Sequence, residues 1–149
     1  MLSDPYSEEI VKTVIGIVHE AERIGDLTKS LEKTGRLAKK PRMGDRVRPL
    51  RDMRDRILRM FKYARKGFVE SEQEEARKLM EEHEQMKDDV TAYLKALADR
   101  EDITPNESMV YAMSARLMSR VSSHLSNIAS TVVSPFDEIR RAPTWDDEE

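Results

Sequence analysis

Two carboxylates and an imidazole lie close together in the stretch His19-Glu20-Ala21-Glu22-Arg23-Ile24-Gly25-Asp26. In a helix of 3.6 residues per turn, Glu22 and Asp26 fall one turn apart on a shared face, and His19 falls on the same face. Such side chains are ligands for a metal ion, but one helix rarely supplies a complete ligand set. The pattern therefore predicts a metal site only if another helix contributes further ligands.

A second pair of carboxylates, Glu84 and Asp88, repeats this spacing and the same displacement from the apolar side of its helix. The most that this chain can assemble is one site built from both carboxylate pairs, with His19 as an additional ligand. Assembly of that site requires the two helices to bring their carboxylate faces together. The other interpretation is that all of these side chains lie on solvated helix faces and pair with nearby Lys or Arg.

Four long helices are expected from hydrophobic periodicity and from the positions of Pro and Gly, at about residues 5–39, 48–68, 72–100 and 105–134. Ser71 with Glu74 and Thr104 with Glu107 match the capping box that opens a helix. Short connections favour an all-α, antiparallel up-and-down four-helix bundle over residues 1–134, followed by a C-terminal tail over residues 135–149. The expected buried line of the first helix is Ile10, Val14, Ile17, Ala21, Ile24, Thr28 and Leu31, and that of the fourth is Val110, Met113, Leu117, Val121, His124 and Ile128.

The composition excludes several classes of protein. The chain of 149 residues is 38% hydrophobic and 37% charged and has no Cys, which rules out disulfides and thiolate zinc sites. No signal peptide and no apolar run of membrane-spanning length are visible, so we expect a cytoplasmic protein, peripheral to a membrane at most. A net charge of −3 and the lack of a DNA-binding motif argue against a nucleic-acid partner.

Charge is divided unevenly between the two middle helices. Residues 36–66 carry 13 Lys and Arg against three Asp, whereas residues 70–102 carry 12 acids against five bases. We expect the two helices to form a hairpin in which these charges face each other. A basic surface for an acidic partner is the alternative.

Two apolar or small-residue surfaces are candidates for contact with a partner or a second copy. Val11, Ile15 and Val18 form a line beside the main apolar line of the first helix. The fourth helix has a back of small side chains, comprising Ser108, Ala112, Ala115, Ser119, Ser122 and Ser126. This back is covered within the fold, by another subunit, or by something outside the chain.

Catalysis has little support in the sequence. There is no phosphate-binding Gly loop, no nucleophile elbow and no Cys. His83 and His124 lie on apolar helix lines, where a buried and hydrogen-bonded histidine is the expected role. We predict that the protein is not an enzyme.

The run Glu22-Arg23-Ile24-Gly25-Asp26 resembles the E-R-I-G-D signature of the PhoU family of phosphate-uptake regulators. Residues 119–128 resemble a second signature, E-R-I-x-D-H-x-x-N-I, in which Arg120, His124, Asn127 and Ile128 are kept and both acids are replaced, by Ser119 and Ser123. Glu84-x-x-x-Asp88 resembles the family's other carboxylate element. The resemblance begins at the last helix of the first of the family's two three-helix repeats.

The resemblance implies a helical accessory module of phosphate uptake that binds a phosphate transporter, a sodium–phosphate cotransporter or a signalling partner. It also implies a divalent or ferric metal ion (iron, zinc or magnesium) on the carboxylates, although serine is a poor substitute for a carboxylate ligand. We expect a homodimer. The alternative function is a metal-free structural bundle that dimerises and has lost phosphate signalling.

Overall fold

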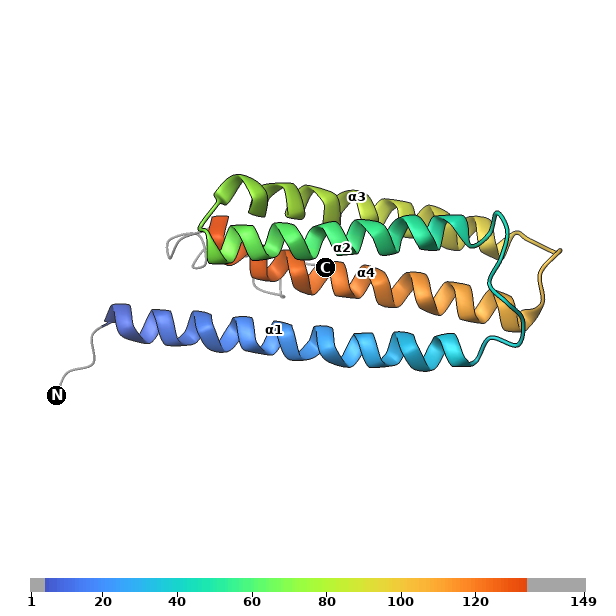
Figure 1. Ribbon diagram of the computed structural model, residues 1–149, viewed down its shortest axis with the longest axis horizontal. Helices are drawn as coiled ribbons and strands as arrows, with labels where there is room; N and C mark the ends of the chain where they lie inside the picture. Colours follow the sequence, from blue (N-terminus) through green and yellow to red (C-terminus); the bar gives the residue numbers. More distant parts are fainter. Residues whose placement is uncertain (1–4, 134–149) are drawn as a thin grey trace, which may run out of the picture.

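The described part of the chain folds into four helices, as predicted. The computed structural model describes residues 5–133, with side chains from residue 7 onward. The helices are α1 (Pro5–Arg36), α2 (Arg48–Val69), α3 (Gln73–Ala98) and α4 (Pro105–Val133), and residues 5–133 contain no strand. Successive helices run in alternate directions (Figure 1). The predicted tail, residues 135–149, lies outside the described residues.

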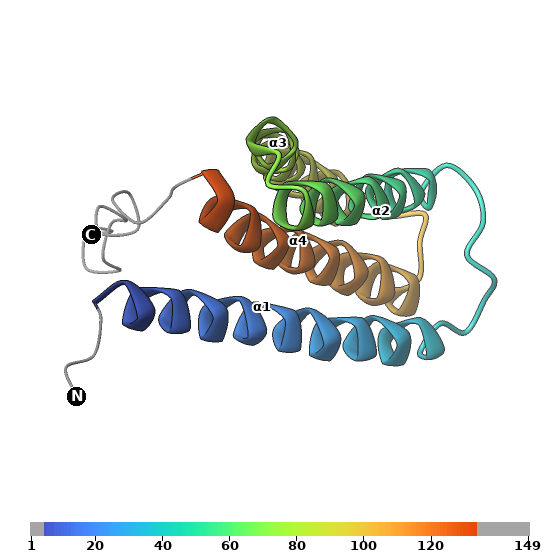
Figure 2. The same cartoon turned by 60° about the vertical axis from the view of Figure 1, so that its left-hand side comes forward.

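α4 is the central helix. It packs against each of the other three helices, and α2 also packs against α3, whereas α1 packs extensively only against α4. Figure 2 shows α4 lying between α1 and the α2–α3 hairpin. The up-and-down order is therefore confirmed, but the arrangement is a three-helix core of α2, α3 and α4 with α1 laid along one side.

The core is filled mainly by aliphatic side chains from α2, α3 and α4. Met60, Leu79, Met86 and Leu125 are among the largest fully buried side chains. α2 and α3 approach closely near their connection, where a Cβ atom added to Gly67 would lie 3.1 Å from the Cβ of Ala76. The glycine therefore allows the hairpin to close tightly.

The buried stripe of α1 is rotated from the predicted one. Ile24 and Leu27 are buried, and Thr34 is buried near the helix end, whereas the predicted core residues Ile10 and Val14 are about half exposed. Ala21 and Thr28 are exposed as well. The prediction took the main apolar line of α1 as its buried side, but among the described helices α1 packs extensively only against α4, which covers a narrow stripe.

The small-residue back of α4 is largely covered within the chain. Ala115, Ser119 and Ser122 are buried, so they are not available as the predicted partner surface. Ser108, Ala112 and Ser126 are half-buried. Small side chains on α4 allow close packing against α3, while the predicted core residue Met113 points outward and is 42% exposed.

Helix ends explain the small differences from the predicted bounds. α1 ends at Arg36 because the next amides bond back to Thr34 and Gly35, and because Asn106 accepts from Lys39 N and donates to Leu37 O. Glu107 N donates to Thr104 Oγ1 at 3.2 Å, as expected for an N-cap.

The capping box predicted at Ser71 is not formed. Ser71 has a φ of 54°, and α3 begins after Glu72 without a side-chain cap. Ser71 therefore belongs to the turn between α2 and α3 and is not the first residue of the helix.

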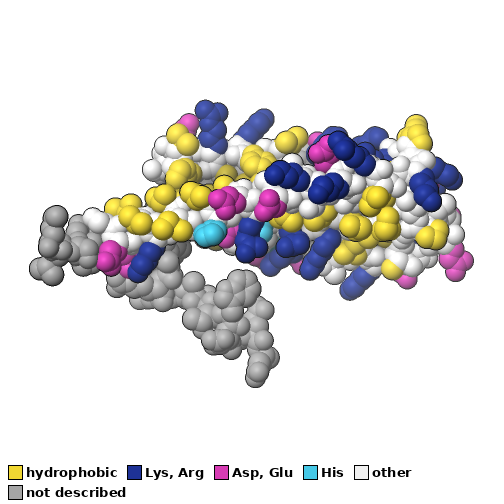
Figure 3. All heavy atoms as spheres, turned by 90° about the horizontal axis from the view of Figure 1, so that it is seen from below, with side chains coloured by type: hydrophobic (Ala, Val, Ile, Leu, Met, Phe, Trp, Pro, Cys, Tyr) yellow, Lys and Arg dark blue, Asp and Glu magenta, His cyan; other side chains and the backbone are white. Residues whose placement is uncertain are grey.

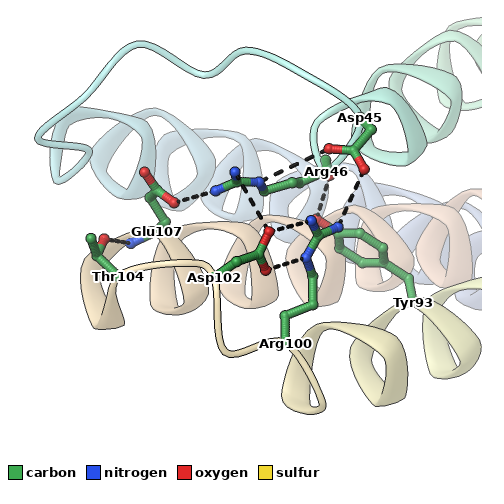
Figure 4. Close-up of polar contacts among 7 residues, drawn as sticks. All are labelled: Asp45, Arg46, Tyr93, Arg100, Asp102, Thr104 and Glu107. Atoms are coloured by element: carbon green, nitrogen blue, oxygen red, sulfur yellow. Dashed lines mark hydrogen bonds and ion pairs between the residues drawn. The ribbon is translucent and has the colours of Figure 1, made fainter.

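A polar cluster fastens the α1–α2 loop to the α3–α4 connection at the same end of the bundle (Figure 4). Arg46 Nη1 lies 2.9 Å from Glu107 Oε2. The backbone carbonyl of Arg46 accepts a 2.9 Å hydrogen bond from the Tyr93 hydroxyl. Arg100 on the α3–α4 connection lies 3.5 Å from Asp45. Burial raises the pKa of Tyr93 to about 12. The loop that leads away from α1 is thus held to both α3 and α4.

Candidate functional site

The largest group of exposed large apolar side chains on any of the described helices lies on the first half of α1. Five side chains form it, and each is between 51% and 54% exposed: Ile10, Val11, Val14, Ile15 and Val18. We call these five residues the outer face of α1. Figure 3 shows apolar side chains gathered over this part of the molecule and basic side chains gathered over the opposite part. The prediction that Val11, Ile15 and Val18 form an accessible apolar line is consistent with this geometry.

The outer face continues along α1 as a line of ever smaller side chains. At 100° per residue, Ala21 and Gly25 follow Val14 and Val18 on the same side of the helix. Ala21 is exposed, and nothing lies within 4 Å of a Cβ atom added at Gly25. The backbone of α1 is therefore bare at this point, so another helix can approach it closely.

The carboxylates predicted to bind a metal lie on two helices that do not pack together. Glu22, Asp26 and His19 are exposed on α1, and Glu84 and Asp88 are exposed on α3. Glu84 pairs with Lys87 at 2.8 Å, which outweighs desolvation and lowers the Glu84 pKa. Within residues 5–133, no group of three or more His, Asp or Glu side chains is placed to hold a metal. These residues alone do not fit a complete metal centre, and metal binding stays a prediction that needs ligands from elsewhere.

The surface around the second signature carries basic side chains. Ser119 and Ser123 line a shallow hollow of about 280 Å³ between α3 and α4, together with Lys87, Arg116 and Arg120. Three cationic side chains around two hydroxyls disfavour a metal cation at this place. The loss of both acids therefore coincides with a positively charged surrounding.

The two histidines of the apolar lines have structural partners. His83 is buried, and its Nδ1 lies 2.8 Å from Ser122 Oγ. His124 is less buried and pairs through Nδ1 with Glu20 on α1. The buried, hydrogen-bonded role is confirmed for His83, whereas His124 is a polar link between α4 and α1.

On one side of α2, a basic side chain of α2 pairs with acidic side chains of α3, as predicted from the uneven charges of the two helices. Arg56 donates to Glu82 at 2.7 Å and to Asp89 at 2.5 Å. Burial opposes ionisation of Asp89, but its bonds from Arg56 and Gln85 outweigh burial and lower its pKa. Charge pairing across the hairpin is therefore present.

A groove on the other side of α2 was not predicted from the sequence. Arg42, Arg51 and Arg54 line it, beside Glu32 of α1. The excess of basic residues over residues 36–66 was the available signal. Their convergence was not readable, because Arg42 belongs to the loop before α2.

Comparison with known proteins gives one finding. The model of the PhoU family (PhoU domain) matches residues 50–132, which is more than half of the chain. No curated protein and no solved structure matches the chain. The matched segment contains α3 and the signature-like residues 119–128, while the E-R-I-G-D run of α1 precedes it.

No helix within residues 5–133 is both long enough and apolar enough to cross a membrane. The helical bundle and the match over α2, α3 and α4 agree with the resemblance seen in the sequence. The chain belongs to the PhoU family, whose domain is associated with phosphate-related regulation.

Proposed function

We propose that the protein is a non-enzymatic regulatory module of phosphate uptake that acts in the cytoplasm and docks on a phosphate transporter or its signalling partner through the outer face of α1. The observation that carries this proposal is the exposure of Ile10, Val11, Val14, Ile15 and Val18 on a helix that packs extensively against only one of the other described helices. Family membership supplies the link to phosphate, and the free face supplies the means of contact.

Burial of the outer face would stabilise a complex appreciably. Each of its five side chains is about half exposed. Complete burial of a Val or Ile side chain is worth about 1.5–3 kcal/mol, so covering the remaining half contributes about 1 kcal/mol each. Ala21 and Gly25 extend the surface to a position where helix backbones can come close, which favours a helical partner.

Substitution on the outer face separates docking from folding. The double variant Val14→Glu/Val18→Glu places two charges on the face while keeping good helix formers. Lys12→Glu is the control, because it changes charge on the same exposed stretch of α1 but on another side of the helix. Tagged wild type and Lys12→Glu should retain transporter or sensor components, identified by mass spectrometry, and should restore the phosphate response of a strain that lacks the protein. The double variant should lose both.

A structural dimerisation module would give a different result. In that case the outer face would be covered by a second copy, and light scattering would show a dimer that Val14→Glu/Val18→Glu converts to a monomer. A double variant that is still dimeric, still retains its partner and still restores the phosphate response would overturn the proposed docking face.

A metal on α1 is a separate proposal with its own test. Glu22 and Asp26 border the outer face, so a docked partner can add the ligands that the chain itself does not bring together. Elemental analysis of the complex should then show iron, zinc or magnesium that is lost on replacing Glu22 and Asp26 with Ala. Equal metal content in the complexes of wild type and variant would exclude this site.

A further inference from the structure

A groove between α1, α2 and α4 combines an apolar floor with a basic rim. It has a volume of about 650 Å³. Its floor contains the buried side chains Val47, Leu50 and Met118, and its rim contains Arg42, Arg51 and Arg54. The groove lies toward the C-terminal end of α1, at the opposite end of that helix from the outer face.

The arginines of this rim are poorly neutralised. Arg54 pairs with its neighbour Asp55 at 2.9 Å, whereas Arg51 donates only to the carbonyl of Arg42, at 3.3 Å. Glu32 is the only acid among the described residues that line the groove, and it bonds to Arg36. Among the described residues, neither Arg42 nor Arg51 has a carboxylate partner. Guanidinium groups bind carboxylates well through paired hydrogen bonds, so the rim suits an acidic segment with an apolar side chain.

The chain itself contains a segment of this chemistry. Trp145 is its single tryptophan and is followed by Asp146-Asp147-Glu148-Glu149. We propose that Trp145 binds on the apolar floor of the groove and that the acidic residues after it pair with Arg42, Arg51 and Arg54. The proposal concerns contact within one chain and goes beyond the docking of a partner on the outer face of α1.

The chain is long enough for this contact. Met118 in the groove is 15 residues before Val133 on α4, a distance of about 22 Å at the helical rise of ~1.5 Å per residue. Trp145 is 12 residues after Val133, and these residues can span up to about 40 Å at ~3.3 Å per residue. Because the segment is tethered, its effective concentration at the groove is of the order of millimolar, so a weak contact is sufficient.

The single tryptophan makes the contact measurable in the full chain. Its emission wavelength and its quenching by iodide report whether Trp145 is shielded. In the wild type we expect a blue-shifted emission and weak quenching. Arg51→Glu should shift the emission to that of a solvated tryptophan and raise quenching several-fold. Salt at about 1 M, where the screening length is ~3 Å, should weaken the shielding in the wild type.

Matched variants distinguish the groove from other surfaces. Arg65→Glu makes the same charge change at an exposed position of α2 outside the groove and should leave the wild-type emission unchanged. Asp146→Lys/Asp147→Lys should expose Trp145, and combining it with Arg51→Glu should restore shielding through the reversed charge pair. Circular dichroism of each variant confirms that the helices are intact.

Three results would overturn the proposal. The first is a solvated Trp145 in the wild type, or equal quenching in the wild type and Arg51→Glu. The second is exposure of Trp145 by Val14→Glu but not by Arg51→Glu, which would place the segment on the outer face of α1. The third is shielding that disappears on dilution, because contact within one chain does not depend on protein concentration.

Discussion

His83 on α3 and Ser122 on α4 share a buried hydrogen bond of 2.8 Å between Nδ1 and Oγ. Ser122 donates its own hydroxyl proton to the carbonyl of Ser119 at 2.6 Å. Its oxygen is therefore free to accept, and the proton of the His83 bond belongs to Nδ1. This arrangement fixes one neutral tautomer of His83 in the closely packed interface between α3 and α4.

Removal of the serine hydroxyl should destabilise the fold. Ser122→Ala leaves the Nδ1–H group of His83 buried without a partner, which costs about 1–3 kcal/mol in the free energy of unfolding. Ser123→Ala is the control, because Ser123 is only half-buried, and it should change stability by less than about 0.5 kcal/mol. Urea unfolding followed by circular dichroism measures both, and equal effects would contradict the structural role of this bond.

Stability should fall in mildly acidic solution because of the same residue. Burial lowers the pKa of His83 below its ordinary value. As the pH falls below about 6.5, the His83 imidazole is protonated in the unfolded chain before it is protonated in the folded chain. The contribution of neutral His83 to the free energy of unfolding is therefore fully present above that pH and is lost progressively below it. A His83→Gln variant should show a weaker decrease of stability between neutral and mildly acidic pH. An unchanged pH profile would count against a neutral, buried His83.

Two of the helical glycines, exposed Gly25 and buried Gly67, should respond in opposite ways to alanine. Gly25 meets open space on α1, so Gly25→Ala should stabilise the isolated protein by about 0.5–1 kcal/mol through helix propensity. Gly67 is crowded by Ala76, so Gly67→Ala should destabilise it by about 1–3 kcal/mol. Thermal unfolding of the two alanine variants measures the difference in stability. A third variant, Gly25→Leu, tests docking, because it should weaken partner capture without loss of stability.

Arg56 should be the most important cation of the α2–α3 hairpin. It holds Glu82 and Asp89 together, and its side chain is only 15% exposed. Arg56→Ala should cost about 1–3 kcal/mol, as expected for hydrogen bonds to charged groups. Arg59 is 53% exposed and lies 3.9 Å from Glu82, so Arg59→Ala should cost less than about 1 kcal/mol. Similar losses in the two variants would show that exposure does not decide the strength of these pairs.

The carboxyl group of Asp102 should titrate at unusually low pH. Hydrogen bonds from Arg100 lower its pKa to about 2. This ion pair contributes stability above the ordinary Asp value, and the contribution is lost as the pH falls through about 2. Carboxyl NMR of the wild type and of Arg100→Gln measures the shift, and the Asp102 pKa should return toward its ordinary value in the variant.

The sequence predicted the helices well because their signals are local. Long apolar periodicities, Pro105 after Thr104, and Pro49 at the start of α2 are enough to place four helices within a few residues of their ends. The resemblance on Glu22 to Asp26 likewise pointed to the family that the match over residues 50–132 shows.

The faces of the helices were harder to predict because they depend on which helices become neighbours. α1 has apolar residues on two sides, and only its packing against α4 decides that Ile24 is buried and Val14 is not. The small side chains Ala115 and Ser119 look like a surface in the sequence, but they are buried within the bundle. The groove is lined by Arg42 of a loop and by Arg51 and Arg54 of a helix. Helical periodicity in the sequence therefore does not predict that these three side chains lie together.

The single interface of α1 has a consequence for assembly. An element that contacts the rest of the chain on one side only, through a connection of 11 residues between Arg36 and Arg48, can be exchanged for the same element of another molecule. In such a domain swap, Ile24 and Leu27 would meet the same α4 surface as before, and the His124–Glu20 pair would form between chains. The outer face of α1 would remain uncovered in the exchanged dimer. Self-association by exchange and capture of a partner on that face are therefore compatible in this architecture.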